Sequence, residues 1–171
     1  DRVKGYRNFL NKLWNANNFL IQNDCKFENI ETPNDLKLNI NKWIFVEFTN
    51  TNEKIKKSID SYRFDEAARI AYQFVWHSFC DWYLELSKTI FYSENNENIE
   101  ETKNVASFIF TQILVILHPF IPFLTEEIWL KNKLDKDGKD FLMLKNWSEA
   151  SSSKDKDSNE VNEITVSYTH L

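Results

Sequence analysis

Glycine and proline are scarce in this sequence, and their scarcity restricts the fold. The 171 residues include two glycines and three prolines, the residue types that tight turns use most. A turn-rich β fold is therefore disfavoured, and long helices are expected. Two glycines also cannot supply a glycine-rich phosphate-binding loop, so the sequence indicates no nucleotide-binding site of that kind.

Cysteine is equally rare. Cys25 and Cys80 are the only two, and thiols so far apart in the chain give neither a disulfide framework nor a zinc site. We therefore predict no bound metal. The start of the sequence also lacks a signal-peptide pattern, because its charged residues are not followed by an apolar stretch. These features together predict a reduced, cytoplasmic protein.

Acidic residues outnumber basic ones, which gives a formal net charge of −5. This charge argues against a protein that coats nucleic acid indiscriminately. The charges are unevenly placed, however, because residues 1–22 contain four basic side chains and one acid. A local basic surface is therefore still expected near the start of the chain.

Apolar residues recur at helical spacing along most of the chain and predict an all-α fold. We expect an antiparallel helix bundle over residues 1–147, with a short irregular C-terminal extension. The expected helices are 2–21, 36–61, 65–92, 102–117 and 125–132, with a polar loop at 93–101, Thr125 as a helix cap and an extended piece at 141–144. Residues 148–171 are rich in Ser, Lys, Asp and Glu, which predicts a disordered tail, and 166–171 are a candidate non-native addition.

Two of these helices give specific predictions about burial. The apolar stripe of the third helix includes Phe79 and Trp82, so both are expected to face the core. Residues 104–124 contain no Asp, Glu, Lys or Arg and are long enough to span a bilayer. Because Gln112 and two prolines interrupt this segment, a central core helix is favoured over a membrane span.

Catalytic constellations are not recognisable in the sequence, and we predict no catalytic residue and no cofactor bound by this chain. His77 and Asp81 lie one helical turn apart and match a general base with its orienting acid. No candidate nucleophile accompanies them, so a structural polar pair is the favoured interpretation. His118, which precedes a proline at a helix end, is likewise interpreted as a capping or core histidine.

A polar stripe follows one face of the first helix at spacings of four and three residues. It consists of Lys4, Asn8, Asn11, Asn15, Asn18 and Gln22. Asparagine amides can donate to and accept from base edges, and Lys or Arg can hold phosphate. The alternative is a solvated helix face. As candidate RNA-binding residues we select Lys4, Arg7, Asn8, Asn11, Lys12, Asn15 and Phe19.

Three segments also resemble a known family. They are GYRNFLNKLWNA at 5–16, DEAARIAYQFVWHSFCDWYLEL at 65–86 and HPFIPFLTEEIW at 118–129. In this order and at these distances they resemble the helical anticodon-binding domain of valine–tRNA ligases, which are class I aminoacyl-tRNA synthetases. The resemblance covers residues 1–147. Isoleucine and leucine enzymes share the bundle, but FCDWYLEL beside the first helix is more similar to the valine enzymes.

The resemblance implies a function and indicates which parts of the family's complete enzyme this sequence does not contain. In that family the bundle contacts the anticodon stem and loop, and the complete enzyme attaches valine to its tRNA using ATP. This chain contains neither the catalytic signatures nor the editing domain, so the resemblance implies a monomeric fragment. Its expected partners are valine tRNA and the missing catalytic domain, with no membrane and with ATP bound only by the full-length enzyme. A helical protein-interaction domain unrelated to RNA is the alternative.

Overall fold

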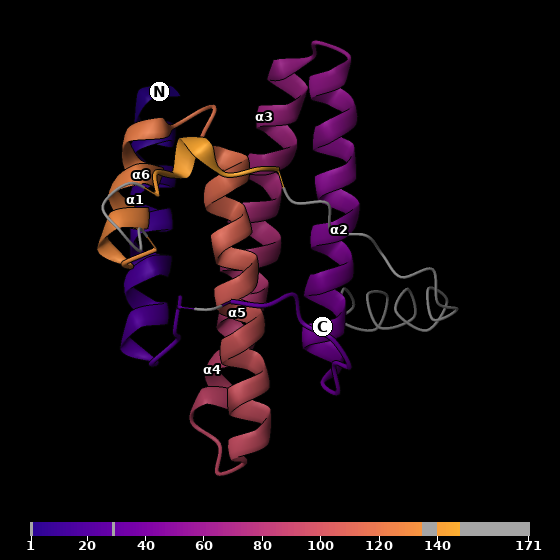
Figure 1. Ribbon diagram of the computed structural model, residues 1–171, viewed down its shortest axis with the longest axis vertical. Coiled ribbons are helices and arrows are strands. Elements are labelled where there is room, and N and C mark those ends of the chain that lie inside the picture. Colours follow the sequence, from indigo (N-terminus) through magenta and orange to yellow (C-terminus); the bar gives the residue numbers. More distant parts are fainter. Residues whose placement is uncertain (1, 29, 135–139, 148–171) are drawn as a thin grey trace.

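The computed structural model describes residues 2–28, 30–134 and 140–147, and these residues form a bundle of helices without any strand (Figure 1). Consecutive long helices run in alternating directions, so the predicted antiparallel all-α bundle is confirmed. The predicted tail at 148–171 lies outside the described residues. The elements are α1 (Arg2–Gln22), α2 (Asn39–Asp60), α3 (Phe64–Gln73), η1 (Phe74–Tyr83), α4 (Leu84–Phe91), α5 (Asn96–Leu117), α6 (Pro122–Lys131) and η2 (Leu142–Leu144).

Helix α5 forms the centre of the bundle. Its buried side chains point in all directions, as expected for a helix that is apolar nearly all round. Helices α1, α2, α3, α4 and α6 and the turn η2 contact it, and η1 packs on it through Phe79 and Phe110. The prediction of a core helix is therefore confirmed, and no helix among the described residues is long and apolar enough to cross a membrane.

Helix α5 begins earlier than predicted, so the expected polar loop at 93–101 is wrong. Asn95 caps the helix by accepting a hydrogen bond from the Asn98 backbone N–H at 3.2 Å. The polar residues of the first turns have partners at the start of α2 and in the two residues before it. The Glu101 carboxylate accepts from the backbone N–H groups of Lys37 and Leu38 at 2.9 and 3.0 Å. This acid therefore fixes the backbone that leads into α2, whose N-cap residue Leu38 makes no side-chain capping bond.

The last segments also differ from prediction. Pro122 occupies the first turn of α6, where a missing N–H costs nothing. Thr125 is therefore not a cap; its hydroxyl donates to the Ile121 carbonyl at 3.1 Å and lies 2.9 Å from His118 Nδ1. This contact makes His118 a structural residue. Residues 142–144 form a 3₁₀ turn rather than an extended piece, and Trp147 Nε1 then donates to Asn52 Oδ1 at 2.8 Å.

The predicted third helix is continuous but contains the π-helical segment η1 in its middle. At its end the Leu84 N–H bonds to the Phe79 carbonyl, five residues back. The wider turns displace the α-helical repeat by about one position, so Tyr83 is fully buried while Trp82 is 48% exposed. The prediction that Trp82 faces the core is therefore wrong, because it assumed an unbroken α-helical period.

Tyr83 is joined to the polar contacts that begin α2. Its hydroxyl donates to Asn41 Oδ1 at 2.9 Å, and Asn41 Nδ2 donates to Glu101 Oε1 at 2.9 Å. Both Tyr83 and Asn41 are 0% exposed, so these hydrogen bonds satisfy groups that would otherwise be costly to bury. The network links the π-helical segment to both α2 and α5.

Both cysteines lie in the core, where their thiols have low reactivity. Burial raises the pKa of the Cys25 and Cys80 thiols from 9.0 to about 12. The thiolate is the reactive form, so neither side chain is a nucleophile near neutral pH. Within the described residues no group of acids, histidines and cysteines is suitable for a metal ion.

We expect substitutions on the buried and the exposed side of the π-helical segment to differ in their effect on stability. Phe79 is fully buried against Tyr83 and Phe110, so Phe79→Ala is expected to lower the free energy of unfolding by about 3–5 kcal/mol. Trp82→Ala is expected to cost about 1 kcal/mol or less. Urea denaturation monitored by circular dichroism measures both. If Trp82→Ala lowers the free energy of unfolding as much as Phe79→Ala does, Trp82 is buried and the proposed shift of the helical repeat is wrong.

The buried thiols give a second prediction. Iodoacetamide at pH 8 is expected to leave the folded chain unmodified and to label both Cys25 and Cys80 once urea unfolds it, because only unfolding returns the thiol pKa to about 9. Intact-mass spectrometry counts the added groups. Rapid labelling of the folded chain would contradict the burial of these side chains.

Candidate nucleic-acid interface

The polar stripe predicted on α1 forms one exposed face of that helix. Lys4, Asn8, Asn11 and Asn15 are all exposed, and Arg7 is exposed at the edge of the same face. The opposite side of the helix is buried in the core and consists of Phe9, Leu13, Ala16 and Leu20. The face is therefore held on a helix whose position is determined by core packing, and its amides and cations are open to solvent. The helical spacing of Tyr6 with Leu10, Leu13 and Leu20 predicts an apolar stripe, but the Tyr6 side chain is 67% exposed.

Lys12 lies at the edge of this face that borders η1, and its charge is already paired. Its ammonium forms an ion pair with the Asp81 carboxylate and lies 4.4 Å from the centre of the Trp76 ring. His77 Nδ1 is 3.3 Å from the other oxygen of Asp81. The proximity of His77 and Asp81 is thus as predicted, and their partner is a lysine rather than a nucleophile. A phosphate at Lys12 has to compete with Asp81 for the ammonium.

Phe19 is half-buried between α1 and α4. Its ring centre is 5.9 Å from that of Phe91, and Lys88 Nζ is 5.8 Å from the Phe19 ring centre. One face of the ring is therefore used in packing. This placement restricts Phe19 as a stacking partner for a base.

The opposite edge of the exposed face borders α6 and contains residues that sequence analysis did not select. Lys131 Nζ lies 4.3 Å from the centre of the Trp14 ring and 3.2 Å from Asn18 Oδ1. Beneath them, Asn132 Nδ2 donates to Asn17 Oδ1 at 2.8 Å. Asn18 and Lys131 are 113 positions apart, so no local pattern could associate them. The one signal in the sequence is that Trp14 flanks the polar stripe, and its side chain is half-buried.

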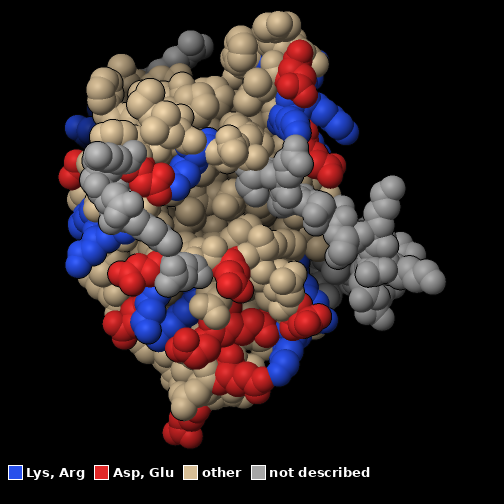
Figure 2. Space-filling model, in the orientation of Figure 1, with Lys and Arg blue, Asp and Glu red and all other residues tan. Residues whose placement is uncertain are grey.

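Charge is distributed along the long axis of the bundle. Figure 2 shows acidic side chains over the lower part of the visible face, where α4 ends and α5 begins. Helix α1 starts at the opposite end, as the N-terminal label in Figure 1 shows. On this face the acidic side chains of the described residues therefore gather away from the end at which α1 starts, and a net charge of −5 for the whole sequence does not describe the α1 surface.

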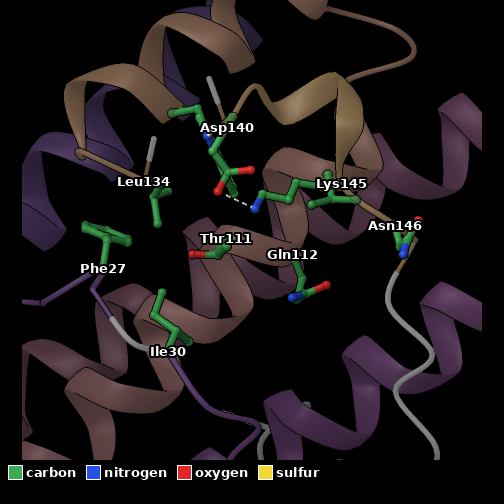
Figure 3. Close-up of a pocket in the computed structure, with 10 residues that line it drawn as sticks. Phe27, Ile30, Thr111, Gln112, Leu134, Asp140, Lys145 and Asn146 are labelled. Carbon is green, nitrogen blue, oxygen red and sulfur yellow. Dashed lines mark hydrogen bonds and ion pairs between the residues drawn. The ribbon is translucent and has the colours of Figure 1, made fainter. Parts of the chain in front are cut away.

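A hollow of about 280 Å³ opens beside α5 and is lined by none of the residues of the exposed α1 face (Figure 3). Phe27 and Ile30 line one side and Thr111 and Gln112 lie at its base, as Figure 3 shows. Lys145 lines it too, but its ammonium is 2.6 Å from the Asp140 carboxylate. Because this charge is paired and no other cation lines the hollow among the described residues, the α1 face remains the better candidate for binding an anion.

The sequence matches one family model, that of the anticodon-binding domain of tRNA ligase, over residues 41–169. Helix α1 precedes the matched residues, but curated relatives match it as well. Valine–tRNA ligase of Pelagibacter ubique (strain HTCC1062) is 60% identical over 171 residues, which are 100% of this chain and 20% of that protein. The resemblance found in the sequence motifs is thereby confirmed.

More distant relatives agree with this match. Valine–tRNA ligase of Buchnera aphidicola subsp. Schizaphis graminum (strain Sg) is 47% identical over 152 residues, 87% of this chain and 16% of that protein. Valine–tRNA ligase of Bartonella henselae (strain ATCC 49882 / DSM 28221 / CCUG 30454 / Houston 1) is 38% identical over 162 residues, 94% of this chain and 18% of that protein. The chain spans about a fifth of the length of these relatives.

Proposed function

Because the chain belongs to the family of anticodon-binding domains of tRNA ligases, we propose that it binds the anticodon stem and loop of valine tRNA as part of a valine–tRNA ligase. The complete ligase joins valine to its tRNA with ATP, and the catalytic and editing steps belong to parts of the polypeptide outside this chain. The observation that supports the proposal most directly is the exposed amide and cation face of α1, whose other side is fixed in the core.

The chemistry of this face suits an RNA loop. Unstacked loop bases expose hydrogen-bonding edges, which proteins read with side-chain amides and with nearby cations on the backbone. Asn8, Asn11 and Asn15 each offer a donor and an acceptor from one rigid helix. Lys4 and Arg7 provide positive charge at the start of the same face. The amides are thus proposed to read bases, and the two cations to hold phosphates.

Lys12 and Phe19 belong to the edges of this proposed site. Lys12 is paired with Asp81, and Phe19 packs against Phe91, so both have a structural role before any RNA binds. We propose that they border the bound RNA while the asparagines face it. The ligase is further proposed to be a cytoplasmic monomer whose ATP is bound by the catalytic domain.

A protein-interaction role is the second candidate, and one observation favours it. The beginnings of α1 and α6 and the turn η2 lie at the same end of the bundle (Figure 1). They expose Tyr6, Phe123 and Met143 by 67%, 91% and 70% respectively. Large apolar side chains exposed at one end of a domain suit a contact with another protein. Binding to RNA that weakens steeply with salt separates the RNA role from this one.

The two central asparagines of the α1 face test the proposed function. Asn11→Ala and Asn15→Ala are each expected to reduce discrimination between valine and non-valine anticodons by about 1–3 kcal/mol, the value of a good base-edge contact. Binding is measured with anticodon stem-loop RNAs at two salt concentrations. Lys54→Ala, an exposed change on α2, is the control. If both asparagine variants fold and bind every stem-loop as the unaltered chain does, the face is merely solvated.

Because the proposal assigns catalysis to other parts of the ligase, it also predicts that this chain alone is inactive. The chain is expected to show no valine-dependent ATP–pyrophosphate exchange, because glycine-rich nucleotide-binding signatures are missing from its sequence. A standard exchange assay with the Pelagibacter ubique ligase as positive control measures this. Exchange above background would place the amino-acid activation chemistry within these 171 residues.

A further inference from the structure

The exposed face of α1 lies between two lysine–tryptophan pairs of nearly equal geometry. On the α6 edge, Lys131 Nζ is 4.3 Å from the centre of the Trp14 ring. On the η1 edge, Lys12 Nζ is 4.4 Å from the centre of the Trp76 ring. A cation above an indole ring is stabilised by the negative face of the ring. Each ammonium is therefore held beside the exposed face rather than extended into solvent.

The two lysines differ in their second partner. Lys12 contacts the Asp81 carboxylate, which neutralises most of its charge locally. Lys131 contacts the neutral amide oxygen of Asn18 at 3.2 Å and forms no ion pair with any residue that the structure describes. An incoming phosphate meets an uncompensated cation at Lys131 and a compensated one at Lys12.

Lys131 also extends a line of binding groups along α1. Arg7, Asn11, Trp14 and Asn18 follow one another at spacings of four, three and four residues, so they share one side of the helix. Arg7, like Lys131, forms no ion pair with any described residue. Arg7 and Asn18 are separated by a rise of about 16 Å. An RNA strand lying along this line reaches a cation at each end and amides between them.

We propose that the phosphate backbone of the bound RNA follows the α6 edge of α1, held by Lys131 and Arg7, and that Asp81 withholds Lys12 from phosphate on the opposite edge. This inference rests on the proposed function and specifies the edge of α1 along which the RNA backbone lies. Lys131 is a phosphate-binding residue and Trp14 and Asn18 are its positioning residues. Asp81 makes the two edges unequal, so that a strand has one favoured edge.

The test compares two lysines of matched geometry. Lys131→Ala, Lys12→Ala, Asp81→Asn and the Asp81→Asn/Lys12→Ala double variant are titrated with the anticodon stem-loop of valine tRNA at 50 and 200 mM salt. Lys54→Ala again serves as a control for a general loss of positive charge. Circular dichroism and the urea midpoint of each variant establish that it is folded.

Lys131→Ala is expected to weaken binding and to lower the slope of log K against log salt by about 0.7 to 1, one phosphate contact. The affinity loss between 50 and 200 mM salt then becomes about threefold smaller. Lys12→Ala is expected to leave the slope unchanged. Asp81→Asn frees Lys12, so this variant is expected to bind more tightly with a steeper slope, and the double variant is expected to lose that gain.

Equal effects of Lys131→Ala and Lys12→Ala, or an Asp81→Asn variant that binds no more tightly, would overturn the proposed edge. If that happens while Asn11→Ala and Asn15→Ala still reduce binding, the α1 face binds RNA and only the proposed edge for the RNA backbone is wrong. If the unaltered chain binds the stem-loop no better than an unrelated RNA hairpin and shows no salt dependence, the proposed function itself fails.

Discussion

The bundle depends on a single constraint, which is that α5 has almost no side that tolerates water. A helix with apolar residues all round has to be covered on every side, and α1, α2, the third helix and α6 provide that cover. Each covering helix consequently has one buried and one exposed side. The exposed face of α1 is a result of this arrangement, because residues turned away from the core can be polar without a buried partner, whereas the buried Asn17 bonds to Asn132.

Polar contacts then determine how the covering helices are placed along α5. Glu101 of α5 accepts hydrogen bonds from the backbone just before α2, and Asn41 of α2 accepts a hydrogen bond from the Tyr83 hydroxyl of the third helix. These bonds are directional, unlike apolar packing, so they specify register where burial alone would allow sliding. The first turns of α5 are polar for this reason. The same residues resemble a loop when only their composition is considered.

Much of this arrangement could be predicted from the sequence, and the failures share a cause. The alternation of four and three residues on α1 correctly indicated an exposed polar face, because helical periodicity is a local property. The exposure of Trp82 could not be predicted, since the π-helical turns leave no distinct pattern in the sequence. Lys131 was missed as a neighbour of Trp14, and Asp81 as the partner of Lys12, because contacts between distant helices follow from packing. The family resemblance identified the domain but not these contacts.

The π-helical segment also has a consequence for insertions and deletions. Residues Phe74–Tyr83 connect α3 and α4 with wider turns than an α-helix has. Because these turns accommodate about one extra residue, deleting a residue while they persist, or restoring α-helical turns without a deletion, would rotate α4 by about 100° relative to α3. Leu84 and Ser87 would leave the core, and the hydrogen bond from Tyr83 to Asn41 would be lost. The length of this segment is thus tied to the pattern of residues that follows it, and a change in one requires a change in the other.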